Sequence, residues 1–97
     1  MTLDIQTIST QAAQNVAAQL GVKCQYVLVK NFGVNDIWVG IDADATKTDG
    51  MARIPSDTAQ VIGSNINSVW PGMTFDTLYV YSDEAETDSV EIQPVQW

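Results

Sequence analysis

The sequence contains no histidine and only one cysteine, and these absences exclude most familiar active sites. Histidine is the commonest general base and a common zinc ligand, so a Ser-His-Asp triad and most zinc centres are ruled out. One cysteine cannot form a disulfide within the chain, and we expect Cys24, which lies in an apolar stretch, to be a buried structural thiol. Since no nucleophile–base pair can be identified, we expect a protein that is not an enzyme and that uses no cofactor.

Basic residues are scarce: four lysines and arginines stand against twelve acidic residues, which gives a net charge of −8. So few bases argue against binding to a phosphate backbone or to an anionic membrane surface, and we expect neither a nucleic-acid nor a membrane partner. Long apolar runs and a basic, apolar leader are also missing, so we expect a soluble chain without a signal peptide, made in a reducing compartment.

What the sequence does contain is a β-rich pattern, on a chain of 97 residues of which 45% are apolar. That length supports one modest core, so we expect a single domain over residues 1–97. Segments rich in β-forming residues alternate with Gly, Asn, Asp and Pro, which is typical of strands separated by tight turns. We therefore expect an all-β, mainly antiparallel fold, a small β-sandwich or a jelly-roll-like barrel. The predicted strands cover residues 24–30, 37–42, 51–55, 58–62, 74–81 and 89–93, the first two paired as an antiparallel hairpin.

The first third of the chain has a different pattern. Apolar residues of segment 10–21 recur at helical spacing, and we predict one short N-terminal helix there, ended by Gly21. The alternative is an extended crossover whose alanines pack flat against a sheet. Before it, residues 1–9 alternate between apolar and polar and could form an N-terminal arm that adds a strand to a neighbouring subunit. The residues on the helical stripe are Ala12, Ala13, Val16, Ala17 and Leu20.

Two segments are rich in carboxylates. Asp42 and Asp44 stand at alternate positions like the opening of a calcium-binding loop, and with Asp49 they are the only metal candidates we identify. The pattern then fails, because Lys47 stands where such a loop needs glycine and no acid occupies the twelfth position. We therefore expect a solvated loop and no metal site. The acidic run 83–88 is expected to be a charged turn that keeps sheet edges from pairing with other chains.

Aromatic side chains gather in two places. Trp38 belongs to one predicted strand, and Tyr79 and Tyr81 share one face of another. These three could form a packed face or a subunit contact, or a stacking surface for carbohydrate. Stacking on nucleic-acid bases is disfavoured because the basic residues that normally accompany it are missing.

Large apolar residues also occur where no strand is predicted, and exposing them to water is costly. Trp70 and Met73 lie in an irregular stretch, and Trp97 is the last residue. Trp and Met are enriched at interface cores, so we expect these residues, with Leu3 and Ile5 of the arm, to contact another subunit or a capsid. The alternative is that the tryptophans fold back onto their own domain.

The order of motifs resembles that of small accessory virion proteins of tailed bacteriophages, of the capsid cement or decoration type. The resemblance rests on a strand, Asn-x-Gly, strand, Val-Gly pattern over residues 29–40, and it continues through Ile54-Pro55. A Leu-Tyr-Val-Tyr-Ser strand follows over residues 78–82, and a Val-Glu-Ile strand over residues 90–92. The resemblance spans roughly residues 26–95, which is most of the chain, and its motifs are typical of a β-sandwich rather than of a catalytic site.

The resemblance implies a structural virion protein that decorates or cements the outer capsid as a symmetric oligomer, often a trimer. Its partners would then be copies of itself and the major capsid protein. It would be located on the capsid surface of the virion and assembled in the host cell cytoplasm. Tail, neck and fibre accessory modules use similar sandwiches, and a carbohydrate-binding adhesion module is a further alternative. The resemblance supplies no catalytic residues.

Overall fold

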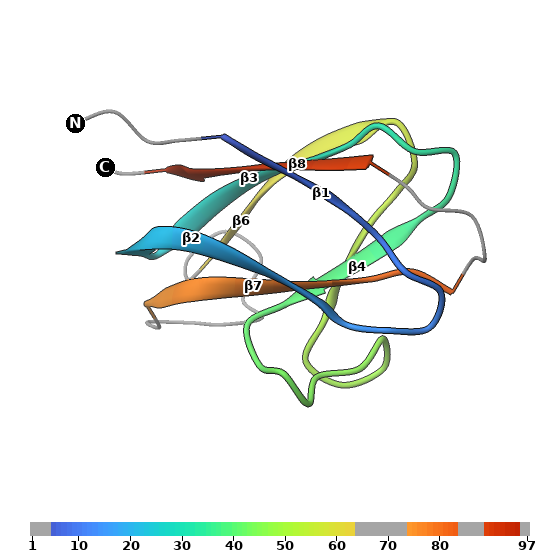
Figure 1. Ribbon diagram of the computed structural model, residues 1–97, viewed down its shortest axis with the longest axis horizontal. Coiled ribbons are helices and arrows are strands. Elements are labelled where there is room, and N and C mark those ends of the chain that lie inside the picture. The colour runs from blue at the N-terminus through green and yellow to red at the C-terminus, as the bar shows by residue number, and fades with distance from the viewer. Residues whose placement is uncertain (1–4, 64–73, 84–88, 96–97) are drawn as a thin grey trace.

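The protein is described here from a computed structural model, which describes residues 5–63, 74–83 and 89–95. Within these residues there are strands, turns and bends and no helix, so none is long and apolar enough to cross a membrane. Figure 1 shows how the strands are arranged. The strands are β1 (Gln6–Ser9), β2 (Val16–Cys24), β3 (Tyr26–Asn31), β4 (Ile37–Gly40), β5 (Ala52–Ile54), β6 (Thr58–Gly63), β7 (Phe75–Tyr81) and β8 (Ser89–Val95).

The eight strands form two antiparallel sheets of four, in the orders β1-β8-β3-β6 and β2-β7-β4-β5. Four of the pairings nest inside one another along the chain: β4 with β5, β3 with β6, β2 with β7, and β1 with β8. A long hairpin that is turned at the β4–β5 connection and then rolled up gives this order, which is that of a jelly roll. The predicted fold class, an antiparallel β-sandwich of jelly-roll type, is confirmed.

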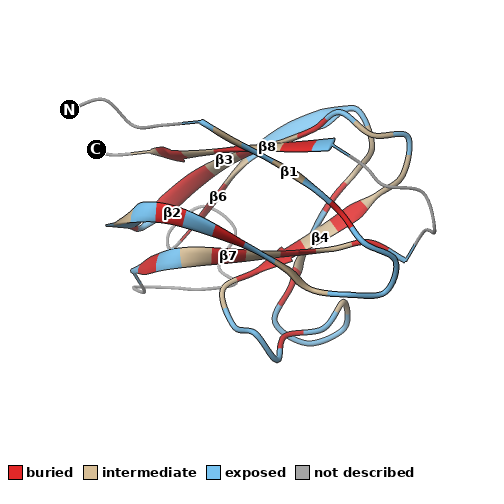
Figure 2. Ribbon diagram, viewed as in Figure 1, coloured by how far each residue is buried: buried red, intermediate tan, exposed pale blue. Residues whose placement is uncertain are grey.

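The core lies between the two sheets, and the strands contribute to it at alternate positions (Figure 2). In β7, Leu78 and Val80 are completely buried, whereas Tyr79 and Tyr81 lie on the outer face and are partly exposed. Burying one such aliphatic side chain contributes about 1.5–3 kcal/mol to the stability of the fold. Many such side chains together stabilise a domain of this size. The buried core cluster is Ala18, Leu20, Cys24, Val27, Val29, Ile37, Val39, Ile54, Ile62, Phe75, Leu78, Val80, Val90 and Ile92.

The predicted N-terminal helix over residues 10–21 is wrong. Strand β2 occupies the second half of this segment. The segment is extended, as in the alternative, but it lies within a sheet beside β7 instead of crossing flat against one, and Ala12, Ala13 and Ala17 are exposed. Ala18 and Leu20 are buried, whereas Ala17 and Gln19 are exposed, which is the alternation of a strand. Alanine favours a helix by its intrinsic propensity, and the pairing of β2 with β7 overrides this preference.

Gly21, predicted to end the helix, lies instead inside β2 with a φ of 79°. The register between β2 and β7 shifts between Gln19 and Cys24, and Gly21 lies in this irregularity. A bulge of this kind bends the strand, and β2 is an edge strand, where bulges discourage pairing with other chains.

The predicted hairpin between the segments 24–30 and 37–42 is also wrong. Strand β3 belongs to the first sheet, between β8 and β6, whereas β4 belongs to the second sheet, between β7 and β5. The connection between them therefore crosses from one sheet to the other. Of the predicted N-terminal arm, residues 6–9 form β1 and pair with β8 of the same chain, and residues 1–4 lie outside the described residues.

Candidate functional site

The connection between β3 and β4 exposes two large apolar side chains, which we call the apolar tip. Phe32 is 58% exposed and Val34 is 78% exposed, and the two flank Gly33. The connection lies at the end of the sandwich away from the chain termini (Figure 1). Single exposed apolar residues are common, but two on one short connection form a small patch that a partner can cover.

The apolar tip is held by Asn31, a buried polar residue at the end of β3 that is 1% exposed. Its Nδ2 donates to the backbone carbonyls of Asn35 (2.9 Å), Ile54 (3.2 Å) and Pro55 (3.2 Å). Its Oδ1 accepts a hydrogen bond from the backbone N–H of Gly33 at 3.0 Å. One side chain therefore connects the start and the end of the tip to the β5–β6 connection.

Asp36 fixes the other end of the apolar tip. Its Oδ2 accepts hydrogen bonds from Nε (2.9 Å) and from one terminal nitrogen (2.5 Å) of Arg53, and its Oδ1 accepts from the backbone N–H of Ser56 (3.0 Å). The hydrogen bonds from Arg53 lower the pKa of Asp36, and the Ser56 amide adds to the effect. Since both ends are tied to neighbouring elements, the tip presents its apolar side chains in a fixed position.

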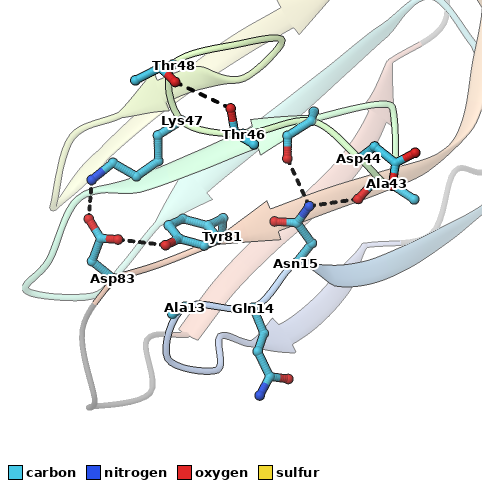
Figure 3. A pocket seen from close by; sticks show the side chains of 11 residues that line it. Ala13, Gln14, Asn15, Ala43, Asp44, Thr46, Lys47, Thr48, Tyr81 and Asp83 are labelled. Atoms are coloured by element: carbon cyan, nitrogen blue, oxygen red, sulfur yellow. Dashed lines mark hydrogen bonds and ion pairs between the residues drawn. The ribbon is translucent and has the colours of Figure 1, made fainter.

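A second feature is a groove on the outer side of the β2-β7-β4-β5 sheet, with a volume of about 710 Å³. Three segments form it: the β1–β2 connection, the β4–β5 loop, and the end of β7 (Figure 3). Its lining residues are Ala13, Gln14, Asn15, Ala43, Asp44, Ala45, Thr46, Lys47, Thr48, Tyr81 and Asp83.

Asp83 is the centre of a polar cluster at one side of the groove. Lys47 Nζ forms an ion pair with its Oδ2, and the hydroxyl of Tyr81 donates to its Oδ1 at 2.8 Å (Figure 3). The hydrogen bond from Lys47 lowers the pKa of Asp83, whereas the bond to Asp83 raises the pKa of both Lys47 and Tyr81. Lys47 Nζ also lies 4.4 Å from the ring centroid of Trp38, and the Trp38 and Tyr81 rings meet edge to face at 6.4 Å.

Asn15 holds the opposite side of the groove. Its Nδ2 donates to the carbonyls of Ala43 (2.9 Å) and Ala45 (3.0 Å), which fixes the β4–β5 loop against the start of β2. Beside it, Ala13 has a φ of 54°, in the left-handed region that residues with a Cβ rarely adopt. The Ala13 N–H donates to the carbonyl of Ser82 at 2.8 Å, and this bond helps to hold the unusual conformation.

The three metal candidates do not meet in one place. Asp42 uses its Oδ1 to accept from the backbone N–H of Asp44 at 2.9 Å, and Asp49 exchanges two backbone hydrogen bonds with Thr46. Both arrangements shape the β4–β5 loop. Among the described residues there is no group of three or more His, Cys, Asp or Glu side chains placed to hold a metal ion.

The other predicted site residues have different outcomes. Ile5 lies beside β1 and is 51% exposed, so it is accessible to a partner. Leu3, Trp70, Met73 and Trp97 lie outside the described residues, and their role as subunit or capsid contacts stays a prediction. Most of the acidic run 83–88 is outside them as well.

The predicted aromatic face is only partly open. Trp38 and Tyr81 face each other across β4 and β7, and Tyr79 faces Gly40, so the three lie on the outer side of one sheet as predicted. The ammonium of Lys47 occupies a position over the Trp38 ring, so that ring is not free for stacking. This arrangement argues against a flat aromatic platform.

Cys24 is buried, as predicted from its apolar surroundings. Its Sγ lies 3.6 Å from the carbonyl oxygen of Phe75, to which it can donate. Burial raises the pKa of the Cys24 thiol, with a further rise from the charge of Asp76, so its thiolate form is disfavoured at neutral pH. This is the environment of a structural cysteine.

Sequence reasoning missed the apolar tip and the groove. Asn31 and Gly33 predict a turn, and the two large apolar residues beside the glycine, Phe32 and Val34, are the signal in the sequence that points to an exposed patch. The groove brings together residues 13–15, 43–48 and 81–83, which lie far apart in the sequence. No local sequence pattern indicates that these segments meet.

The lowered pKa values of Asp36 and Asp83 predict a defined response to acid. Both carboxylates stabilise the fold fully above the ordinary pKa of aspartate, and they lose this contribution as the pH falls through their lowered folded values. We therefore expect Asp36→Asn and Asp83→Asn to be slightly less stable than the wild type at pH 7 and equal to it at about pH 2. Urea unfolding at both pH values measures this. Because both pairs are exposed, added salt should reduce the difference at pH 7, and a difference that persists at about pH 2 would contradict the assignment.

Comparison with known protein families, curated protein sequences and solved structures finds no match to this chain.

Proposed function

We propose that the protein is a structural component of a tailed-phage particle, which decorates or cements the outer capsid as a homotrimer and is not an enzyme. The observation that carries the proposal is the apolar tip, where Phe32 and Val34 are exposed on a connection fixed by Asn31 and Asp36. A rigid connection loses little conformational entropy when a partner covers it, so its apolar contact is converted efficiently into affinity.

The size of the apolar tip favours an oligomer. Two side chains provide a contact too small for stable binding by one copy, since specific interfaces bury about 800 Å² on each partner. A symmetric trimer would present three identical tips at fixed spacing, and binding of the first would raise the effective concentration of the others. Capsids offer matching symmetric positions, which is why this arrangement suits a decorating protein.

The surface charge supports the same role. Three of the four basic residues form ion pairs: Lys30 with Glu91, Lys47 with Asp83, and Arg53 with Asp36. The remaining acidic residues leave the net charge at −8. A field of one sign keeps densely displayed copies and whole particles from associating without specificity.

The partner that we propose is the major capsid protein of the same virion, and the location is the capsid surface, after assembly in the host cell cytoplasm. Leu3, Ile5, Trp70, Met73 and Trp97 stay proposed contacts with a subunit or with the capsid, and Ile5 is the one among them that the structure describes.

Light scattering on the purified chain tests the oligomer. We expect a mass of three times 10.6 kDa, and the same mass for a variant with Phe32→Ser and Val34→Ser, because the apolar tip contacts the capsid and not another subunit. A fall in the mass of the variant would assign the tip to the subunit interface instead. A wild-type monomer at every concentration would contradict the trimer.

Imaging of particles tests the location. Virions of the phage that encodes the chain, labelled with an antibody against it, should show label over the whole head surface. Label confined to the tail, neck or fibres would replace the capsid assignment with an accessory module of that structure. Absence of label from purified virions would contradict the proposal as a whole.

A further inference from the structure

We propose that the groove between the β1–β2 connection, the β4–β5 loop and the end of β7 binds a neutral saccharide of one or two sugar rings. The inference does not rest on a role in a phage particle, because it follows from the lining of the groove alone. If both proposals hold, the protein would connect the particle to a glycan-bearing surface.

The groove has the size and construction of a ligand site. Its volume of about 710 Å³ lies within the roughly 300–1,000 Å³ that small-molecule sites occupy. Its opposite sides are fixed by separate interactions: Asn15 ties the β4–β5 loop to the start of β2, and Asp83 ties the same loop to the end of β7 through Lys47. The space is therefore preformed, and a ligand would not have to organise it.

The polar groups of the groove suit sugar hydroxyls, which both donate and accept. A carboxylate has about four acceptor positions, and the Lys47 and Tyr81 bonds to Asp83 leave further positions for a ligand. The Oδ1 of Asn15 points toward Tyr81 while its Nδ2 is held by the loop carbonyls (Figure 3). The hydroxyls of Thr46 and Thr48, 3.5 Å apart, add two groups that donate and accept.

The charge of the groove favours a neutral ligand. Asp44 and Asp83 stand against one lysine, and Lys47 is already paired with Asp83 and packed over Trp38. A phosphate, sulfate or acidic sugar would meet an excess of negative charge here and in the chain as a whole. Uncharged polyols avoid this cost, and the Tyr81 ring at the groove offers a surface for the C–H face of a sugar.

The backbone at the edge of the groove is also fixed. Ala13 has a φ of 54° as the third residue of a turn that the Gln14 N–H closes on the Gln11 carbonyl at 3.3 Å. A turn with a positive φ at this position holds the chain in one conformation. The Ala13 bond to the Ser82 carbonyl, next to Asp83, links this turn to the polar cluster.

Amide-detected NMR titration of the ¹⁵N-labelled protein tests the proposal. The probes are galactose, glucose, mannose, N-acetylglucosamine, lactose and maltose, each up to about 100 mM, which detects dissociation constants in the millimolar range. Inorganic phosphate and spermidine serve as the anionic and cationic probes. We expect saturable shifts with at least one sugar, confined to the residues of the groove.

Two variants that each remove one negative charge test whether the sugar binds in the groove. Asp83→Asn should weaken the sugar at least about tenfold, because the ligand loses a charge-assisted hydrogen bond and Lys47 is released. Asp76→Asn, on β7 and outside the groove, should leave the affinity unchanged. Equal effects of the two variants, shifts outside the groove, or no shifts with any sugar would overturn the proposal. Saturable binding of phosphate or spermidine, without binding of any sugar, would show that the ligand is not a neutral saccharide.

Discussion

Replacing Asn31 with alanine is expected to lower the free energy of unfolding by about 2–4 kcal/mol, a large part of the stability of a domain this small. The side chain is buried and makes four hydrogen bonds, three from Nδ2 and one to Oδ1. Its removal leaves a cavity and takes a hydrogen bond from the buried carbonyl of Ile54, whereas the Pro55 carbonyl keeps the bond from the Thr58 hydroxyl at 2.7 Å. No apolar residue can replace the amide for this reason.

Urea unfolding followed by tryptophan fluorescence measures the effect of Asn31→Ala on stability. The melting temperature should fall by about 10–25 °C. Gln60→Ala, an exposed change on the neighbouring β6, is the control and should stay within about 0.5 kcal/mol of the wild type. If the two variants were equally stable, Asn31 would not hold the apolar tip. Folded Asn31→Ala should also bind capsids more weakly, because its tip is no longer fixed.

Replacing Gly63 with alanine is expected to prevent the normal pairing of β3 with β6 and to cost more than about 3 kcal/mol. A Cβ at this position would lie 2.1 Å from the carbonyl oxygen of Gln25 and 2.8 Å from the Cα of Tyr26. Both are backbone atoms, so no side-chain rotation can relieve the overlap. Gly63 pairs with Tyr26 at the end of the ladder, and the strands must separate there to admit a methyl group.

Gly21→Ala is the matched control for Gly63→Ala, because both introduce the same methyl group into a strand. A Cβ at Gly21 meets nothing within 4 Å, but the φ of 79° imposes backbone strain, so a loss of only about 1–2 kcal/mol is expected. Circular dichroism and urea unfolding of the two variants separate clash from strain. If Gly63→Ala were no less stable than Gly21→Ala, the close approach of Gly63 to the backbone of Gln25 and Tyr26 would be contradicted.

The fold class could be predicted because strand periodicity is local. The alternation of Leu78 and Val80 with Tyr79 and Tyr81 indicates the two faces of β7 directly, and the structure confirms it. The helix over residues 10–21 could not be excluded in this way, because alanine favours a helix locally and only the long-range pairing of β2 with β7 overrides that preference. The β3–β4 hairpin failed for a topological reason: a short connection rich in Asn and Gly serves equally for a turn within one sheet and for a crossing between two.

The candidate sites were less predictable than the fold. Phe32 and Val34 were visible in the sequence, but only the bonds of Asn31 to Ile54 and Pro55, more than 20 residues away, show that they are held outward. The meeting of Asn15, Lys47 and Asp83 depends on the rolling of the sheets and has no local signature.

Capsid binding by the apolar tip is the central claim, and a sedimentation titration tests it most directly. Heads assembled from the major capsid protein of the same phage are titrated with wild-type protein and with the Phe32→Ser and Val34→Ser double variant. Since each side chain contributes about 1.5–2 kcal/mol when buried, we expect the variant to bind about a hundredfold more weakly. Its stability should be unchanged, because both residues are exposed.

A double variant with Thr7→Ser and Gln60→Ser, both at exposed positions of the first sheet, is the control and should bind as the wild type does. We predict that the wild type and the control saturate the heads at a fixed number of copies. The Phe32 and Val34 variant should lose this binding. Failure of the wild-type protein to bind heads, or equal binding by all three proteins, would contradict the account.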